Sequence, residues 1–184
     1  MSVKQKKRGR PAGSSKALSK LIILQQAKNL LAEQGKIPTL RALAAELNVD
    51  PMALYHYFAN KAALLEAVTV SLLEAIYQPN PEGQWQAEVR QLCHSYLELL
   101  SRYPGLLETM LKMSTDGPAQ VFIARLEQAL TPLALAKVEF EPLRDLLADY
   151  LHGVALAMQC NPGGIPVGCV DAPLDLIFRG LTSR

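Results

Sequence analysis

Apolar residues recur at intervals of three and four along most of the chain, and no useful stretch alternates between apolar and polar positions. This spacing is typical of amphipathic α-helices, whereas half-buried strands alternate with a period of two. Glycines, prolines and capping residues divide the pattern into segments. The sequence therefore predicts an all-α protein with helices over residues 16–34, 40–46, 51–57, 61–77, 85–102, a short stretch ending near 113, 118–136, 140–160 and 172–181.

Residues with strong capping preferences mark the ends of the first helices. Gly35 can end the first helix, because glycine adopts the left-handed conformation at no steric cost. Asn48 and Val49 form the predicted turn between the second and third helices, and Pro51 stands at a first helical position, where proline is tolerated. The predicted N-caps of the first four helices are Ser14 or Ser15, Thr39, Asp50 and Asn60.

Residues 39–66, TLRALAAELNVDPMALYHYFANKAALLE, predict two short helices, a tight turn and the start of another helix. In the second of these helices Leu54 and Phe58 are four residues apart, so they face the same way, toward the core. Pro51, Met52, Tyr55 and His56 then point largely outward. An exposed helix with hydrogen-bonding aromatics beside a cationic arm suits duplex DNA, whose major groove presents donors and acceptors.

The charge distribution supports this interpretation more than the net charge of +2 does. Residues 1–61 carry a net charge of +8 and the remaining residues −6. A basic front and an acidic back are expected when one part meets a polyanion. Residues 1–14, with KKRGRP, form a predicted disordered arm whose Arg8 and Arg10 suit a narrow minor groove. The alternative is a solvated tail that only steers the encounter.

The other side-chain chemistry is sparse. Cys93, Cys160 and Cys169 are an odd set without metal-ligand spacing, so reduced thiols of a cytoplasmic protein are the simplest interpretation, with a redox-sensing thiol as the alternative. The three histidines are scattered, and neither a metal nor a cofactor is expected. The charged N-terminus is no signal peptide, and no apolar run approaches the roughly 20 residues of a spanning helix.

The run from Ile23 to Val68, with ILQQAKNLLAEQG and TLRALAAELNVDPMALYHYFANKAALLEAV, resembles the N-terminal domain of TetR-family transcriptional regulators. The helix-turn-helix followed by LYHYFANKAALL makes the resemblance specific. It implies a helix-turn-helix DNA-binding domain of three helices over residues 15–62. This domain is linked through helix 61–77 to a helical ligand-binding and dimerisation domain over residues 63–184.

Candidate DNA contacts follow from the residue types and from this resemblance. Pro51 and Met52, at the helix tip, offer apolar contact with thymine methyl groups, and Ala53 is small enough for close approach. The resemblance implies that Tyr55, Tyr57 and Lys61 contact phosphates. The full candidate set is Arg8, Arg10, Thr39, Arg41, Pro51, Met52, Ala53, Tyr55, His56, Tyr57 and Lys61. The alternatives without a DNA-binding role are that Tyr55 belongs to a core cluster and that His56 and Lys61 are ordinary surface residues.

The back half carries weaker signals. The resemblance implies a homodimer through a four-helix bundle formed by helices 118–136 and 140–160 of each subunit, with candidate residues Leu143, Leu147, Tyr150, Leu151, Val154 and Ala155. The same face could instead serve only the subunit's own core, and a face shared by both uses is the expectation. The resemblance also implies a small-molecule pocket. Its candidate lining, for which core packing is the alternative, is His94, Tyr96, Met110, Met113, Phe122, His152, Met158 and Gln159.

The leading hypothesis is a TetR-like transcriptional repressor that binds a palindromic DNA operator as a homodimer and is released by a small molecule. One alternative is an architectural DNA-binding protein that uses only the basic arm. Another is a helical enzyme, although the chain contains no GxSxG, HExxH, P-loop or GxGxxG motif. The sequence leaves open the inducer, the operator, the regulated genes and whether transcription is repressed or activated.

Overall fold

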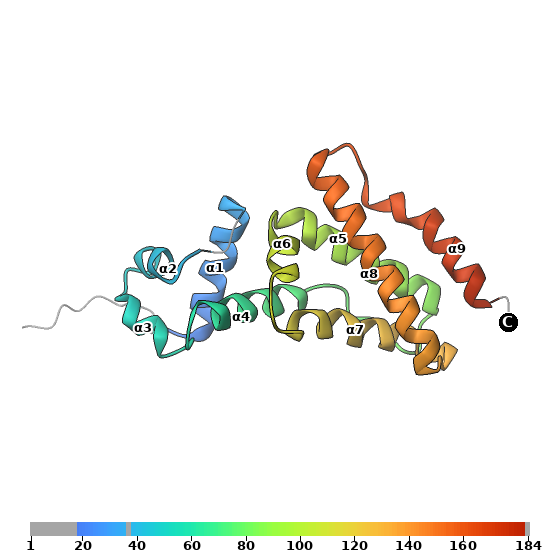
Figure 1. Ribbon diagram of the computed structural model, residues 1–184, viewed down its shortest axis with the longest axis horizontal. Helices are drawn as coiled ribbons and strands as arrows, with labels where there is room; N and C mark the ends of the chain where they lie inside the picture. Colours follow the sequence, from blue (N-terminus) through green and yellow to red (C-terminus); the bar gives the residue numbers. More distant parts are fainter. Residues whose placement is uncertain (1–17, 36–37, 183–184) are drawn as a thin grey trace, which may run out of the picture.

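The computed structural model describes residues 18–35 and 38–182, and all regular structure in them is helical (Figure 1). The all-α prediction is therefore confirmed for this part of the chain. The elements are α1 Lys20–Gln34, α2 Leu40–Glu46, α3 Pro51–Tyr55, α4 Lys61–Leu73, α5 Trp85–Arg102, α6 Leu106–Leu111, α7 Gly117–Ala129, α8 Lys137–Cys160 and α9 Asp171–Thr182, with 3-10 turns Thr131–Leu133 and Val167–Val170.

Several predicted boundaries were wrong, and local hydrogen bonds explain two of them. The first helix begins at Lys20 rather than at 16, because Ser19 is the N-cap and its hydroxyl accepts the Ile22 amide proton at 3.3 Å. The eighth begins at Lys137 rather than at 140, because the Glu139 carboxylate accepts the Ala136 amide proton at 3.0 Å. The helices predicted to end at 57, 77, 113 and 136 end at 55, 73, 111 and 129.

The other predicted caps are confirmed. The side chains of Thr39, Asp50 and Asn60 accept amide protons at 3.1, 2.7 and 2.9 Å. After α2, Asn48 takes a left-handed φ of 52°, its amide bonds the Ala45 carbonyl, and the Val49 amide bonds the Ala44 carbonyl. This pair of bonds is the Schellman motif, which satisfies carbonyls that a helix end leaves free. It sets the tight turn between α2 and α3.

Figure 1 shows α1, α2 and α3 at one end of the molecule and α5 to α9 at the other. We call α1–α3 the head and α5–α9 the body. Helix α4 belongs to both, because it packs against α1 in the head and against α7 in the body. It therefore carries any movement of one part to the other.

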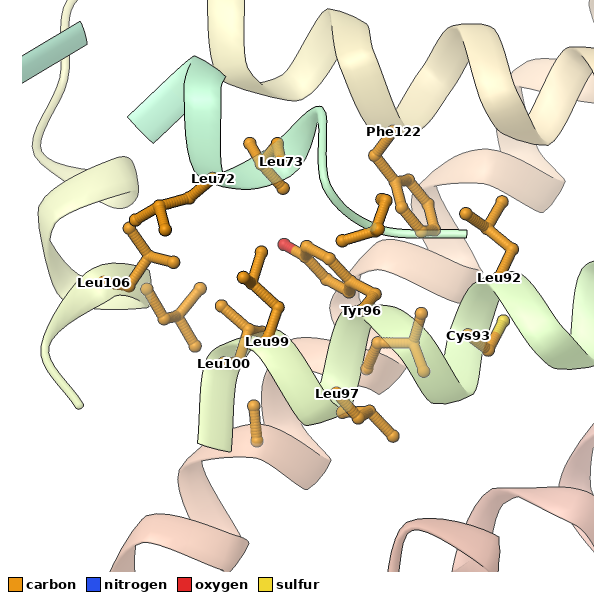
Figure 2. Close-up of a cluster of buried hydrophobic side chains, with 14 of the residues drawn as sticks. Leu72, Leu73, Leu92, Cys93, Tyr96, Leu97, Leu99, Leu100, Leu106 and Phe122 are labelled. Atoms are coloured by element: carbon orange, nitrogen blue, oxygen red, sulfur yellow. The ribbon is translucent and has the colours of Figure 1, made fainter. Parts of the chain in front are cut away.

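The body is built around α5, which contacts α4, α7, α8 and α9. Side chains from α4, α5, α6 and α7 meet in the buried cluster of Figure 2, where Leu72 and Leu73 at the end of α4 face Tyr96, Leu99 and Leu100 of α5. Burial of such apolar area is the dominant favourable contribution to folding. Helix α9 is attached to α5 by Trp85 and Phe178, whose ring centroids lie 5.0 Å apart.

A second contact between head and body involves two glycines. Gly35, after α1, and Gly105, before α6, have left-handed φ values of 66° and 80°. A Cβ atom at Gly105 would lie 2.4 Å from the Gly35 carbonyl oxygen. Since only glycine lacks this atom and adopts this conformation freely, both the approach and the φ value require glycine at position 105.

Candidate nucleic-acid interface

Helix α3 is attached to the head by its buried side. Leu54 is fully buried and Phe58, just beyond the helix, is 3% exposed. Met52 and Tyr55 are 66% and 46% exposed, His56 is also exposed, and Pro51 and Ala53 are half-buried. The predicted inward positions of Leu54 and Phe58 and the outward positions of Met52, Tyr55 and His56 are therefore confirmed, whereas Pro51, also predicted to point outward, is half-buried. The tip of α3 presents an apolar surface beside two polar aromatic rings.

Cations flank this surface. Arg41 on α2 and Lys61, the first residue of α4, are exposed, and so is Thr39. Among the described residues no ion pair joins a side chain of α1–α4, so the positive charge of Arg41 and Lys61 is not neutralised by a neighbouring carboxylate. Lys61 also stands at a helix N-terminus, whose free N–H groups favour anions.

Tyr57 ties the end of α3 to the beginning of α1. Its hydroxyl donates a hydrogen bond to the Leu18 carbonyl at 2.6 Å, and its side chain is still partly exposed. Close by, the Lys20 ammonium lies 5.7 Å from the Phe58 ring centroid. The chain before Leu18, which includes Arg8 and Arg10, lies outside the described residues. Tyr57 thus fixes the point from which the basic arm leaves the head.

The body contains a cavity of about 190 Å³ between α5, α6, α7 and α8. Four of the eight predicted ligand residues line it: Tyr96, Met110, Phe122 and His152. The rings of Tyr96 and Phe122 pack with centroids 4.8 Å apart. The Tyr96 oxygen lies 2.9 Å from His152 Nε2. This pair, Arg144 and Asp145 are the polar residues of the lining, and the remaining lining residues are apolar.

Burial governs the charge state of this polar pair. Burial raises the pKa of Tyr96 and lowers the pKa of His152. The negative charge of the nearby Asp149 opposes the lowering of the His152 pKa but is the smaller effect. Both groups are thereby favoured in their neutral forms at neutral pH. In the neutral tautomer that carries its proton on Nδ1, the His152 imidazole accepts a hydrogen bond from the Tyr96 hydroxyl at Nε2.

The structure does not bring the other four predicted ligand residues to this cavity. His94 Nε2 lies 2.8 Å from the Asp171 carboxylate at the start of α9. Met113 lines a separate groove of about 320 Å³ beside the start of α4. Met158 and Gln159 are half-buried near the end of α8, and the Gln159 side-chain nitrogen has no hydrogen-bond partner among the described residues.

Four of the six predicted dimerisation residues lie in the subunit's own core. Leu143, Leu147, Leu151 and Ala155 are at most 7% exposed, because α8 turns them toward α5 in the subunit's own core. Side chains so enclosed offer little area to a second subunit, and Tyr150 and Val154 are only half-buried. The large apolar side chains that α8 and α9 expose are Val138, Leu146, Leu156 and Leu176.

The thiols are free, and burial raises the pKa of the Cys93 thiol to about 12. Cys93 is therefore protonated at neutral pH, which makes it a poor nucleophile. Cys160 is exposed and Cys169 is half-buried. Within the described residues, no group of three or more His, Cys, Asp or Glu side chains could hold a metal ion, and no helix has the length and apolar character to cross a membrane.

Two buried charged residues were missed at the sequence level: Glu88 on α5 and Arg125 on α7. Both contact the connection between α4 and α5. Their signal is present in the sequence, because each stands inside an apolar stripe at helical spacing: Trp85, Val89 and Leu92 around Glu88, and Phe122, Leu126 and Ala129 around Arg125. A charge in such a stripe is buried if the helix packs by that face.

Known proteins resemble the chain in sequence and in fold. Residues 23–68 match the family described as bacterial regulatory proteins, tetR family. The HTH-type transcriptional repressor DrrR1 of Streptomyces coeruleorubidus is 29% identical over 126 residues, which cover 64% of this chain and 44% of that repressor. The match thus spans less than half the length of DrrR1.

Solved structures extend the likeness to the body. BioQ of Mycobacterium smegmatis superposes with a TM-score of 0.73 at 22% identity, over 90% of this chain and 98% of BioQ. ActR of Streptomyces coelicolor, solved with actinorhodin, gives 0.75 at 20% identity, over 90% of this chain and 96% of ActR. BioQ solved with its double-stranded DNA operator gives 0.71 at 23% identity, over 91% and 99%. These structures share the fold of the chain.

Proposed function

Because residues 23–68 match the family of bacterial regulatory proteins described as tetR, we propose that the chain is a TetR-family transcriptional repressor that binds a palindromic DNA operator as a homodimer and is released by a small molecule. Residues 15–62 bind DNA, helix α4 links them to the body, and residues 63–184 dimerise and bind the effector. The protein is a regulator rather than an enzyme, and it acts in the cytoplasm, where the chromosome lies.

The observation that carries the proposal is the outer face of α3. A five-residue helix buries Leu54 and presents Met52 at 66% exposure, and the Schellman turn after α2 sets it at a fixed angle to that helix. A helix-turn-helix places the N-terminal residues of its second helix against base edges. Relatives support the same role, since DrrR1 is a repressor and BioQ has been solved with its operator.

We divide the candidate DNA contacts into two groups. Pro51, Met52 and Ala53 contact bases through apolar surface, mainly thymine methyl groups, and Arg41 reads a base or reaches a phosphate. Tyr55 and Lys61 bind phosphates, and Thr39, His56 and Tyr57 border them. Arg8 and Arg10 of the arm add minor-groove contacts. The phosphate contacts give affinity, whereas the tip of α3 gives sequence preference.

The effector occupies the cavity of the body. At about 190 Å³ the cavity is smaller than most ligand pockets, which measure about 300–1,000 Å³, and is close to an engineered cavity of about 150 Å³ that binds benzene. Its apolar walls and the neutral Tyr96–His152 pair suit a small, mostly apolar molecule with one hydrogen-bonding group. Other TetR-fold structures hold larger compounds, such as the actinorhodin bound to ActR.

Dimerisation uses the apolar side chains that α8 and α9 leave exposed. Leu146 and Leu156 on α8 and Leu176 on α9 are 55%, 48% and 63% exposed. Gly153 and Ala157, exposed on the same helix, leave room for a second helix to approach closely. Two subunits present two heads, and binding of the second half-site is then intramolecular.

Selection of bound duplexes from a random pool tests the proposal directly. The full-length dimer is expected to enrich one inverted repeat and to bind it far more tightly than random DNA at about 0.15 M salt, where specific binding by such proteins exceeds non-specific binding by roughly 10³–10⁷. Equal binding to selected and random duplexes would refute a specific regulator. A variant lacking residues 1–14 separates the architectural alternative, which predicts that nearly all binding is lost with the arm.

A further inference from the structure

The chain between α4 and α5 is held by hydrogen bonds from both sides, and we call residues 74–80 the link. We propose that Arg125 of α7 is a positioning residue that sets the direction of α4 through the link and thereby the separation of the two heads in the dimer. The inference rests on the proposed DNA-binding function and names a residue for which neither the fold nor the family match gives a role.

Arg125 donates hydrogen bonds to three carbonyls of the link. Its Nη2 donates to the Glu74 carbonyl at 2.7 Å, and its Nη1 donates to the carbonyls of Ile76 and Tyr77, the latter at 3.2 Å. These carbonyls lie just past the last turn of α4, where a helix leaves acceptors unpaired and carries partial negative charge. The rigid guanidinium fork of arginine can bind several acceptors at once, unlike the single ammonium of lysine.

The opposite side of the link is bound to α5. The Tyr77 amide donates to Ser95 Oγ at 2.9 Å, and the Tyr77 hydroxyl donates to the Glu88 carboxylate at 2.8 Å. The same carboxylate accepts the Asn80 amide proton at 2.7 Å. Tyr77 is therefore fixed through its amide, its carbonyl and its side chain, to two different helices.

The buried charged side chains of the described residues both bind the link. The buried polar side chains of the described residues are Thr69, Glu88 and Arg125, and the last two both bind the link. Arg125 is 9% exposed and takes part in no ion pair among the described residues, so the carbonyls of the link, together with the attraction of the Glu74 carboxylate, compensate its charge. Burial lowers the pKa of Arg125, yet arginine stays charged. Apolar packing would tolerate small shifts of α4, whereas directed hydrogen bonds tolerate few.

Arg125 also connects the link with the effector cavity. Helix α7 carries Arg125 and, one turn before it, Phe122 and Ile123 of the cavity lining. In Figure 2 the chain that leaves α4 after Leu73 runs between α7 and α5, beside the packed rings of Tyr96 and Phe122. A ligand that displaces α7 therefore moves the group that holds the end of α4.

The length of α4 converts a small tilt into a useful displacement. Its 13 residues span about 18 Å, so a tilt of about 10° at the link moves Lys61 at the far end by about 3 Å. That displacement is close to the rise of one base pair, about 3.4 Å. Freedom at the link is therefore expected to change which spacing of half-sites the dimer accepts.

The test compares full-length Arg125→Met and Arg125→Lys with wild type and with a matched control, Lys28→Met. Lys28 donates to the Ser71 carbonyl of α4 at 3.0 Å, so it too is a cation bound to a carbonyl of this helix, but it lies on α1 in the head. Each protein selects duplexes from a pool in which the distance between two half-sites varies. Hydrogen exchange of the backbone amides of residues 74–78 and Asn80 is measured in parallel.

Wild type and Lys28→Met are expected to select one narrow spacing. Arg125→Met should keep the half-site sequence but accept spacings at least one base pair longer or shorter, and the link amides should exchange roughly 10- to 100-fold faster, as loss of hydrogen bonds to a charged group implies. Arg125→Lys should fall between the two, and it decides the test if Arg125→Met does not fold. A merely structural residue would lower stability without changing the spacing.

Unchanged spacing in a folded Arg125 variant would overturn the inference while leaving the proposed function intact. The same broadening in Lys28→Met would also overturn it, because any weakening of α4 would then suffice. If wild type selected no duplex, the proposed function would fail and the inference with it. The wild-type and control results differ between these outcomes, so failure of the inference about Arg125 is distinguishable from failure of the proposed function.

Discussion

Replacing Lys61 by alanine removes an exposed cation from the N-terminus of α4, the helix that follows α3. The Asn60 cap, which accepts the Ala63 amide proton at 2.9 Å, is left in place, so α4 should begin as before. If Lys61 binds phosphate, the loss weakens binding to every duplex by a similar factor. The variant is therefore expected to keep the sequence preference of wild type.

The expected magnitude follows from counterion release. Each phosphate contact contributes about 0.9 to the slope of log affinity against log salt, so two copies of Lys61 in a dimer lower the slope by about 1.8. The affinity gap between wild type and variant should then shrink about sevenfold as salt rises from about 0.1 to 0.3 M. At high salt the two proteins should bind almost equally.

The measurement is a titration of the selected operator at several salt concentrations, by fluorescence anisotropy. Lys137→Ala is the control, because Lys137 is an exposed lysine at the start of α8, in the body. This control should reproduce the wild-type slope. A Lys61→Ala slope equal to that of wild type, or an equal fall in Lys137→Ala, would refute the phosphate contact.

Three further predictions concern other parts of the chain. Met52→Ala should change the preferred bases without changing the salt slope, and an unaltered selected sequence would contradict base contact by this side chain. Leu54→Ala should lower the free energy of unfolding by about 2–5 kcal/mol in a denaturant titration, because the side chain is fully buried, and a change under about 1 kcal/mol would contradict its place in the core. Burial lowers the pKa of His152 in the folded state, so as pH decreases below about 6.5 the imidazole is protonated more readily in the unfolded chain than in the folded protein. The free energy of unfolding should therefore decrease as pH decreases. His152→Gln should lose less stability than wild type between about pH 7.5 and 5.5, and equal losses in the two proteins would contradict the effect of burial on this imidazole.

Local signals made the head predictable from sequence. Thr39, Asp50 and Asn60 cap helices through contacts two or three residues away, and Leu54 and Phe58 face inward because of their spacing. These interactions depend on neighbours in the chain, so the sequence contains the necessary information. The wrong start of the first helix also has a local cause. Ser14 or Ser15 was predicted as the cap, whereas Ser19 caps the helix by accepting the Ile22 amide proton.

The body was less predictable because its contacts are distant in sequence. Periodicity identified an apolar face on α8, but it could not distinguish the side toward α5, with Leu147 and Leu151, from the exposed Leu146 and Leu156. The pairing of Tyr96 with His152 spans 56 residues, and no spacing rule anticipates it. The separation of His94 from the cavity also depends on where α9 packs.

The close approach of Gly35 and Gly105 limits how this protein can diverge. A side chain at position 105 would meet the carbonyl oxygen of Gly35, which every amino acid possesses, so no substitution at position 35 could compensate. At most contacts between packed helices, substitution by a larger side chain can be compensated by a smaller side chain in the contacting residue. No such compensation is possible at this junction, and relatives that share it are expected to retain glycine at position 105 even where the residues that face DNA have changed to suit other operators.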